Sequence, residues 1–554
     1  MIYWLFALFL LIIIIVASNY FKKQSLTKKR IAEIKEQWAK RKDEHLNFNL
    51  IAAYLTTTGG KLAASAADLD LDDVFSYLDR TSSKPGQQCL FKQLHSPEIS
   101  ADYFTSLEKR IEKLDTDQQQ RELVQLKLSE LNDGDAYSLP RLFTQNHQSL
   151  FAPLVKFYIN IAAPVIIGLI VGLVIAPNAG YLMLLFVMVI INLGVHYSNK
   201  SKMVSYTRSL PQLLLLIKIS KWLFDNGVLD ESVQMKQNLL KVADLKKSLS
   251  FISVQNTVAA DPTDIVFLFS EWIKIIFLLE AVNFTRSINK VNQYTAEIKL
   301  LFEAVGEVDI AISIQSVREG LIHYCRPEFT KANESIVIKE LYHPLIENCV
   351  ANSITIDNSQ GVLITGSNMS GKTTFIRAIA INALLAQTIN TSFAIVYQAP
   401  PLNIFTSINM TDDLGGHKSY FQAEALSVRN IIRDCEEGQP RNSLVIIDEI
   451  FRGTNTIERI AASKAVLSHF IENRCFVLVS THDLELAELL GSDYKVFSFE
   501  EIAGDNRLTF DYKIKDGLLR NKNGIAVLKG LDYPQKIIDE ASKISMQLRN
   551  KYDL

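Results

Sequence analysis

The chain contains a stretch, from Phe157 to Asn199, without a single Asp, Glu, Lys or Arg side chain. Residues 177–180, Pro-Asn-Ala-Gly, interrupt this stretch near its middle and favour a tight turn. Each half is then about 20 residues long, which is the length that an α-helix needs to cross a bilayer. Lys156 and Lys200 flank the stretch, so both of its ends would lie on one side of the membrane. The sequence therefore predicts a transmembrane helical hairpin over residues 151–200, with a buried helical pair in a soluble core as the alternative.

The N-terminal residues Met1 to Ser18 are also uncharged, and basic residues begin at Lys22. A cleaved signal peptide normally has a positively charged segment before its apolar run, and none precedes this one. We therefore predict an uncleaved transmembrane anchor over residues 1–20. Cytoplasmic flanks of membrane helices are enriched in Lys and Arg. This rule places the N-terminus and the hairpin turn outside, and the rest of the chain in the cytoplasm.

Residues 21–60 are expected to form a basic juxtamembrane helix. The part from residue 22 to residue 44 holds nine Lys or Arg and four Asp or Glu. Three interpretations remain open for this part: a solvated helix, a surface attracted to anionic lipid head groups, or a site for nucleic acid. The whole chain has a formal net charge of -2, so its average charge does not favour a nucleic-acid binder.

The five cysteines stand singly and form no C-x-x-C pair. This pattern argues against a zinc site and against a disulfide framework, and it is typical of a protein in a reducing cytosol. The cysteine pattern therefore favours the cytoplasm for the soluble part of the chain, as the lysines beside the apolar stretches also do.

Outside the apolar stretches, the first part of the chain has the periodicity of amphipathic helices. We assign residues 61–150 and 201–334 to the first and second parts of a helical core, which the hairpin interrupts. From residue 335 on, short β-rich runs such as "GVLITG" and "SLVIIDEI" alternate with helical runs. This alternation predicts an α/β domain with a largely parallel sheet over residues 335–554.

The segment "GSNMSGKTTF" has the spacing of a phosphate-binding P-loop, and it lies between a predicted strand and a predicted helix. Glycines in such a loop let backbone N–H groups turn toward the phosphates. The Lys372 ammonium is suited to neutralise phosphate oxygens, and the Thr373 hydroxyl to bind Mg²⁺. The sequence thus predicts ATP and Mg²⁺ as cofactors. The loop residues expected to contact the nucleotide are Gly366, Ser367, Asn368, Met369, Ser370, Gly371, Lys372, Thr373 and Thr374.

Two further predicted strands end in polar residues that complete the site. "SLVIIDEI" brings Asp448 and Glu449 to a strand end, and "VLVSTHD" does the same for His482. Asp448 is expected to hold the Mg²⁺ together with Thr373. Glu449 is expected to act as the general base on the attacking water, and His482 to sense the γ-phosphate. The predicted catalytic residues are therefore Glu449, Lys372 and His482, and the predicted metal ligands are Thr373 and Asp448.

The C-terminal part contains, in order, "TGSNMSGKTTFIRAIA", "IFTSINMTDDLGGHKSYFQAE", "LVIIDEIFRGTNT", "STHDLELAELL" and "GIAVLKGLDYPQKIIDEASKI". These segments resemble the Walker A loop, the signature segment, the Walker B strand with its loop, the terminal histidine segment and the closing helix of the MutS family of DNA mismatch-repair ATPases. Upstream, "YLDRTSSKPGQQCLFKQLHSP" at residues 77–97 resembles the start of that family's helical core. The resemblance extends over residues 65–150 and 205–554.

The resemblance implies a C-terminal α/β P-loop ATPase domain of the ABC type. An all-α MutS-like core would precede it, interrupted by the transmembrane hairpin, with the N-terminal transmembrane helix in front. It also implies a homodimer in which two ATPase domains enclose two nucleotides. Ser419 of the signature segment would then reach the γ-phosphate bound by the partner, with Glu424 as a second signature residue.

The sequence departs from the family's pattern in three places. No room exists before residue 65 for the family's mismatch-reading domain, and the hairpin occupies the place of its DNA clamp. The place of the family's adenine-stacking aromatic residue falls at Cys349, so the sequence identifies no stacking residue. These departures weaken the expectation that the protein discriminates mismatched DNA.

We therefore expect a membrane-anchored MutS-like ATPase, in which ATP binding and hydrolysis drive dimer closure. DNA is a ligand implied by the family resemblance, and a membrane or cytosolic partner is unidentified. The alternatives are a DNA mismatch-repair or recombination protein tethered to the membrane, or the ATPase subunit of a membrane complex. A transporter is disfavoured, because the hairpin offers only two helices and no charged residue that would mark a substrate path.

The predicted topology can be tested with a cysteine at the hairpin turn. In whole cells, Ala179→Cys is expected to react with a membrane-impermeant thiol reagent, because the turn faces outward. Labelling of the unsubstituted chain measures the background from its five cysteines, which are expected inside. Reaction of Ala179→Cys only after lysis would refute this orientation.

Overall fold

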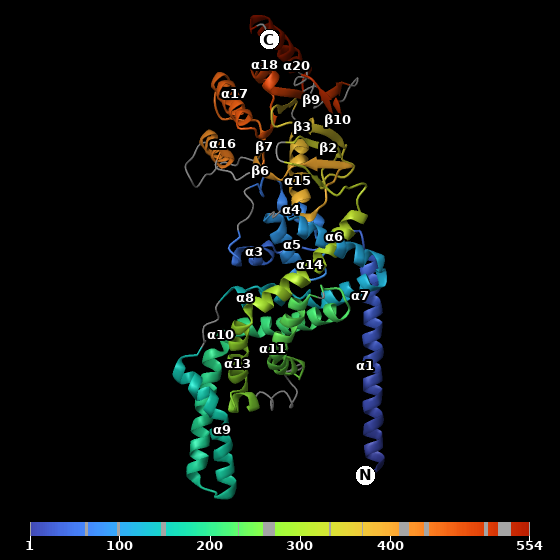
Figure 1. Cartoon of the computed structure of the whole chain (residues 1–554). Helices are drawn as coiled ribbons and strands as arrows, with labels where there is room; N and C mark the ends of the chain where they lie inside the picture. The colour runs from blue at the N-terminus through green and yellow to red at the C-terminus, as the bar shows by residue number, and fades with distance from the viewer. Residues whose placement is uncertain are drawn as a thin grey trace. The chain divides into compact units, whose positions relative to one another are not determined.

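The computed structural model describes most of the chain (Figure 1). The described residues are 2–60, 65–96, 100–145, 151–230, 232–258, 272–331, 334–367, 369–408, 420–436, 442–503, 508–518 and 533–552. They form two compact units. The first unit contains residues 1–61, 79–92 and 105–317, and the second contains residues 62–78, 93–104 and 318–554. The structure thus divides the chain differently from the boundary expected at residue 335, because two upstream segments pack with the ATPase unit.

The first unit is helical. Its longer helices are α1 (Ile2–Gln37), α5 (Lys84–His95), α6 (Ala101–Thr116), α7 (Gln118–Leu128), α9 (Pro153–Ile175), α10 (Ala179–Asp225), α11 (Val233–Val258), α13 (Leu279–Gln293) and α14 (Thr295–Glu319), of which α5, α6 and α14 also reach into the second unit. Its short helices are α2 (Phe48–Ile51), α3 (Ala53–Thr57), α8 (Arg141–Thr144) and the 3₁₀ turns η1 (Ser129–Leu131) and η2 (Gly134–Ser138). The third apolar stretch of the sequence, residues 264–280, lies partly outside the described residues.

Helix α9 and the first part of α10 form the hairpin expected from the sequence, and Figure 1 shows them side by side. Among the described residues, these are the two helices long and apolar enough to cross a membrane. Only 17% of the apolar window in α9 and 11% of that in α10 is buried in the protein. The buried helix of a soluble core would show the reverse, so the apolar surface of these two helices is not covered by the described part of the chain.

The second helix of the hairpin does not end where the apolar run ends. Helix α10 continues without a break to Asp225, although the sequence suggested a boundary near residue 200. Its later part packs into the helical core, where Leu213, Leu216 and Leu223 are fully buried. The hairpin and the core therefore share one continuous helix.

The basic segment after the predicted anchor is shorter as a helix than the expected range 21–60. Helix α1 ends at Gln37, and its C-terminal end packs on α7. The Arg121 guanidinium lies 3.6 Å from the centre of the Trp38 ring, and the Lys35 ammonium lies 3.2 Å from a carboxylate oxygen of Glu122. These contacts fix the end of α1 on the core.

A buried carboxylate organises the core at the start of α5. Asp309 of α14 accepts hydrogen bonds from the backbone N–H groups of Ser82 and Ser83, at 2.8 Å each, and from the Ser83 hydroxyl at 2.6 Å. A methyl group at Gly86 would lie 2.2 Å from an Asp309 oxygen, so only glycine fits there. Burial raises the pKa of Asp309 to about 6, and the three hydrogen bonds act in the opposite direction.

The second unit holds two sheets. Its strands are β1 (Glu328–Phe329), β2 (Ile336–Leu341), β3 (Asn352–Ile356), β4 (Gly361–Gly366), β5 (Val396–Ala399), β6 (Leu402–Ser407), β7 (Asn442–Asp448), β8 (Phe476–Ser480), β9 (Tyr494–Ala503) and β10 (Leu508–Asp516). Its helices are α4 (Leu71–Leu78), α15 (Lys372–Ile389), α16 (Tyr420–Glu436), α17 (Thr456–Glu472), α18 (Leu484–Leu490), the turn η3 (Gly491–Asp493) and α20 (Gln535–Tyr552). The larger sheet has the order β10-β9-β4-β8-β7-β6, and the smaller one the order β1-β5-β2-β3.

The larger sheet is parallel from β9 to β6, and only β10 runs antiparallel, along β9. Strands β4 and β8 are buried along their whole length, which explains their continuous apolar sequences. In such sheets, ligands bind beyond the carboxyl ends of the strands. Strands β4, β7 and β8 all end at that edge, and each continues into one of the predicted site segments.

Candidate functional site

The loop between β4 and α15 has the backbone geometry of a phosphate-binding loop. Gly366 and Gly371 have φ angles of +145° and +103°, which side chains rarely adopt. A Cβ atom at Gly366 would lie 2.8 Å from the backbone oxygen of Phe499, so the loop lies close against β9. Met369 also has a positive φ, of 77°. Asn368 lies outside the described residues.

Lys372 begins α15 and is buried under this loop. Its ammonium donates hydrogen bonds to the backbone oxygens of Gly366 and Ser367, at 2.7 Å each. Lys372 is only 4% exposed, so these bonds hold a buried positive charge inside the curve of the loop. A cation held inside a glycine-containing loop at the start of a helix is an arrangement that binds phosphate.

The predicted metal ligands lie against each other. The Thr373 hydroxyl donates a hydrogen bond of 2.7 Å to one carboxylate oxygen of Asp448, and the Ser480 hydroxyl donates to the other. A hydroxyl and a carboxylate are hard oxygen donors, which Mg²⁺ prefers. No cluster of three or more His, Cys, Asp or Glu that could hold a metal occurs within the described residues. The two oxygens of Thr373 and Asp448 are sufficient for a Mg²⁺ site in which phosphates and waters supply the other ligands.

Glu449 lies at the centre of a group of charges beyond β7. Its φ angle is +55°, and its backbone N–H donates to the backbone oxygen of Ser480 at 2.9 Å. The same carboxylate oxygen of Glu449 lies 2.6 Å from Arg452 Nε and 3.3 Å from His482 Nδ1. The strained backbone and the contacts with Arg452 and His482 together hold the carboxylate in one orientation.

These contacts shift the pKa values of both partners. Burial alone would raise the pKa of Glu449, but the hydrogen bond with His482 and the charges of Arg452, His482 and Lys372 hold it below its ordinary value. The hydrogen bond with Glu449 raises the pKa of His482, although partial burial acts against this. Glu449 therefore stays ionised at neutral pH, as a general base must.

Of the two predicted signature residues, the structure describes only Glu424, since Ser419 lies outside the described residues. Glu424 is 3% exposed and accepts a hydrogen bond from the backbone N–H of Phe451. Burial raises its pKa, while the N–H groups of Phe451 and Arg452 favour the charged form. Glu424 thus fixes the loop after β7 from α16, and its carboxylate is not exposed to a partner.

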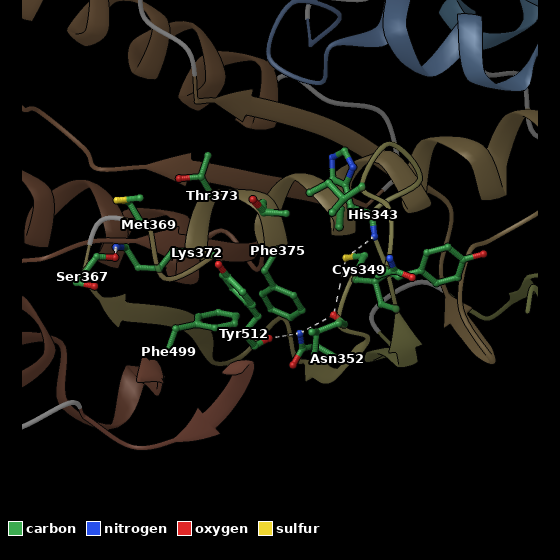
Figure 2. A pocket seen from close by; sticks show the side chains of 18 of the residues that line it. His343, Cys349, Asn352, Ser367, Met369, Lys372, Thr373, Phe375, Phe499 and Tyr512 are labelled. Atoms are coloured by element: carbon green, nitrogen blue, oxygen red, sulfur yellow. Dashed lines mark hydrogen bonds between the residues drawn. The ribbon is translucent and has the colours of Figure 1, made fainter. Parts of the chain in front are cut away.

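A cavity of ≈ 680 Å³ extends from the P-loop toward Cys349 (Figure 2). Tyr512 of β10 lines this cavity, and one of its ring carbons would lie 3.2 Å from a Cβ atom at Gly371. The amide of Asn352 holds the backbone here, because it donates to the Tyr512 oxygen and accepts from the Ile514 N–H, at 2.9 Å each. An aromatic ring therefore lies in the cavity although Cys349 replaces the aromatic residue expected from the resemblance.

The structure brings the described members of the predicted set together at one sheet edge, and it adds three residues that the sequence did not identify. Arg452 and Tyr512 line the cavity, and Ser480 binds the carboxylate of Asp448. The sequence could have identified Arg452 and Ser480, because Arg452 follows Glu449 by three residues and Ser480 precedes His482 by two. Tyr512 had no such signal, because its place depends on the irregular β9–β10 pairing and on the contacts of Asn352 with this part of β10.

Comparison with known proteins agrees with this geometry. Residues 362–549 match the family model of MutS domain V. The MutS protein homolog 4 of Mus musculus is 30% identical over 338 residues, which cover 57% of this chain and 33% of that protein. The DNA mismatch repair protein MutS of Petrotoga mobilis is 31% identical over 302 residues, covering 52% and 35%. The protein of the same name from Listeria welshimeri is 34% identical over 289 residues, covering 49% and 32%.

The chain thus spans about a third of the length of the curated relatives it matches. The MutS resemblance expected from the sequence is confirmed by these matches. The matched family model includes β4, α15, β7 and β8, which carry the P-loop, Asp448 and the strand before His482.

The His482–Glu449 ion pair predicts a pH-dependent contribution to stability. Because the folded-state pKa of His482 is raised, the contribution is fully present below the ordinary histidine pKa and is lost as pH rises through the folded value. Glu449, with its lowered pKa, stays charged throughout this window. The difference in Tm between the unsubstituted chain and His482→Gln is therefore expected to be larger at about pH 6 than at about pH 9.

The control is His45→Gln, which removes an exposed histidine between α1 and α2. If the Tm difference for His482→Gln stayed constant or grew toward high pH, the ion pair would not hold in solution.

Proposed function

The chain belongs to the MutS family through its domain V, and from this premise we propose that it is a membrane-anchored, Mg²⁺-dependent ATPase. In this proposal, ATP binding and hydrolysis drive closure of a homodimer. The observation that carries the proposal is the convergence of Lys372, Thr373, Asp448 and Glu449 at one edge of the parallel sheet.

Each of these residues has one role in hydrolysis. Lys372 and the backbone N–H groups of the loop bind the phosphates and neutralise their charge. Thr373 and Asp448 would hold Mg²⁺, which stabilises the negative charge that develops on the phosphate oxygens. Glu449 orients the attacking water and accepts its proton. Arg452 and His482 keep Glu449 ionised and directed toward the cavity.

The far part of the cavity is suited to the nucleotide base. The ring of Tyr512, which is 45% exposed, offers an aromatic surface next to the P-loop. His343 lines the same cavity, and burial together with the charge of Arg377 lowers its pKa to about 4. A neutral imidazole and a phenol ring favour an uncharged aromatic ligand at this end, with the phosphates at Lys372.

The exposed apolar hairpin supports membrane anchoring. The side chains of Ile170, Val174 and Met183 are between 42% and 77% exposed, and they lie within the uncharged stretch 157–199. Contiguous apolar surface of this kind is costly in water and stable in lipid. With the anchor expected at residues 1–20, we place the N-terminus outside and the ATPase domain in the cytoplasm.

The ATPase proposal predicts two different losses from two substitutions. Lys372→Ala removes the buried cation of the loop, so ATP binding is expected to be lost. Glu449→Gln keeps the shape but cannot accept a proton, so ATP binding is retained while kcat falls by about 10²- to 10⁴-fold. The measurements are binding of a fluorescent ATP analogue and phosphate release, on the full chain in detergent.

The matched control for Glu449→Gln is Glu488→Gln, on the exposed face of α18, which is expected to keep the normal rate. Turnover by Glu449→Gln at the normal rate would remove Glu449 from the role of base. Undiminished ATP binding by Lys372→Ala would remove the P-loop assignment itself.

DNA mismatch recognition at the membrane is the second candidate, because two of the relatives described above are named DNA mismatch repair proteins. Reading a mismatch requires a base step to be unstacked and kinked, at a cost of a few kcal/mol that an inserted apolar wedge and wrapped contacts must offset. The family-model match covers residues 362–549, which carry the nucleotide site, and we expect the hairpin to occupy the place of a DNA clamp.

We therefore expect no preference for mismatched over matched duplex in a competition assay at physiological salt with the detergent-solubilised full chain. Residual DNA binding is expected to be electrostatic and to weaken steeply as salt rises. A preference of tenfold or more, about 1.4 kcal/mol, would instead favour mismatch repair at the membrane.

A further inference from the structure

Two cysteines of the ATPase unit lie against each other, away from the nucleotide site. Cys435 is in the last turn of α16, and Cys475 directly precedes β8. Cys475 is 3% exposed and belongs to the hydrophobic cluster of this unit, and Cys435 is partly exposed and packs against that cluster. Both are free thiols.

The local structure explains why the two thiols meet. Val428, Ile431 and Cys435 recur at helical spacing, so Cys435 continues the buried face of α16. On the sheet side, Leu444 of β7 pairs with Phe476 of β8. The preceding residues, Ser443 and Cys475, are therefore neighbours at the start of the two strands.

The surroundings of Cys435 favour its thiolate. The Cys475 thiol and the Ser443 hydroxyl both hydrogen-bond the Cys435 sulfur, and these bonds lower its pKa although burial and two nearby acids act against them. The same contact and burial raise the pKa of Cys475, so Cys475 is the protonated partner of the two. Burial likewise raises the pKa of Cys89 and that of Cys325. A partly exposed cysteine with a stabilised thiolate and a second thiol beside it is the usual arrangement of a redox-sensitive pair.

We propose that Cys435 and Cys475 form a reversible disulfide on exposure to hydrogen peroxide, and that this bond slows ATP turnover. The inference goes beyond the proposed function, since it assigns a modification site that the hydrolysis of ATP does not use. In a reducing cytosol such a bond is transient, as expected of a regulatory disulfide.

The reaction balances without any other oxidant. The Cys435 thiolate attacks one oxygen of hydrogen peroxide, the O–O bond breaks, and the departing hydroxide takes up a proton to give water. The sulfur of Cys475 then attacks the sulfenic acid at Cys435, the S–S bond forms and the S–O bond breaks. The second hydroxide leaves with the proton of Cys475 as water. A dithiol reductant reverses the bond by thiol–disulfide exchange.

The position of the bond explains its effect on turnover. Helix α16 carries Phe421 and Glu424 at its other end, and both contact the loop after β7 that orients Glu449 and Arg452. Strand β8 leads from Cys475 to Ser480, which binds Asp448. A covalent link between α16 and β8 would restrict any movement of α16 relative to the strands that carry the catalytic carboxylates.

The test uses the full chain in detergent, treated with hydrogen peroxide, with thiol titration and peptide mass spectrometry under non-reducing conditions. The unsubstituted chain is expected to lose two of its five thiols and to yield a peptide linked through Cys435 and Cys475. ATP turnover should fall several-fold and recover with dithiothreitol. Cys435→Ser and Cys475→Ser should each resist this loss of turnover, and Cys325→Ser should behave like the unsubstituted chain.

Survival of all five thiols, or a link through any other cysteine, would overturn the proposed pair. Formation of the bond without a change in turnover would overturn its regulatory effect. Because the thiol titration does not depend on ATP, it also separates this proposal from the proposed function. A reduced chain without measurable ATPase activity would contradict the proposed function. The linked peptide would still decide whether Cys435 and Cys475 form the disulfide.

Discussion

The catalytic edge depends on the carboxylate of Asp448, which joins three segments distant in sequence. Its two oxygens accept hydrogen bonds from Thr373 at the start of α15 and from Ser480 at the end of β8. The strands that deliver these groups are buried, and a carboxylate near such a core is stable only when its oxygens have partners. The P-loop, β7 and β8 therefore hold one arrangement, in which the same oxygens that stabilise the fold are those suited to Mg²⁺.

Beyond this carboxylate, the charges around Glu449 decide what the site does. Arg452 and His482 lie on one oxygen of Glu449 and favour its ionised form, against the effect of burial. Glu424 shows the opposite balance, since burial raises its pKa and its role is to accept a backbone N–H. The charge of Arg452 favours the ionised form of both glutamates, but only Glu449 also has His482 and Lys372 beside it, and only its pKa falls below the ordinary value.

Prediction from the sequence succeeds where the chemistry is local. The P-loop glycines, Asp448 and Glu449 directly follow strands with continuous apolar sequence, and the parallel order of β4, β8 and β7 then brings them together. Tyr512 could not be found in this way, because its place depends on the register between β9 and β10 and on Asn352 of a different sheet. The apolar part of the second hairpin helix ends at Ser198, close to the predicted end at residue 200, but the sequence did not show that the helix itself continues to Asp225.

That continuation gives the hairpin a mechanical connection to the helical core. Helix α10 is one unbroken helix from Ala179 to Asp225, and its buried Asn192 donates a hydrogen bond of 2.5 Å to the backbone oxygen of Ile276. A little farther along, His196 Nδ1 lies 3.9 Å from a carboxylate oxygen of Glu280 on α13. A flexible linker would let the core move independently of the hairpin. A helix held by side-chain contacts transmits a tilt of the core to the hairpin, so the two are suited to move together.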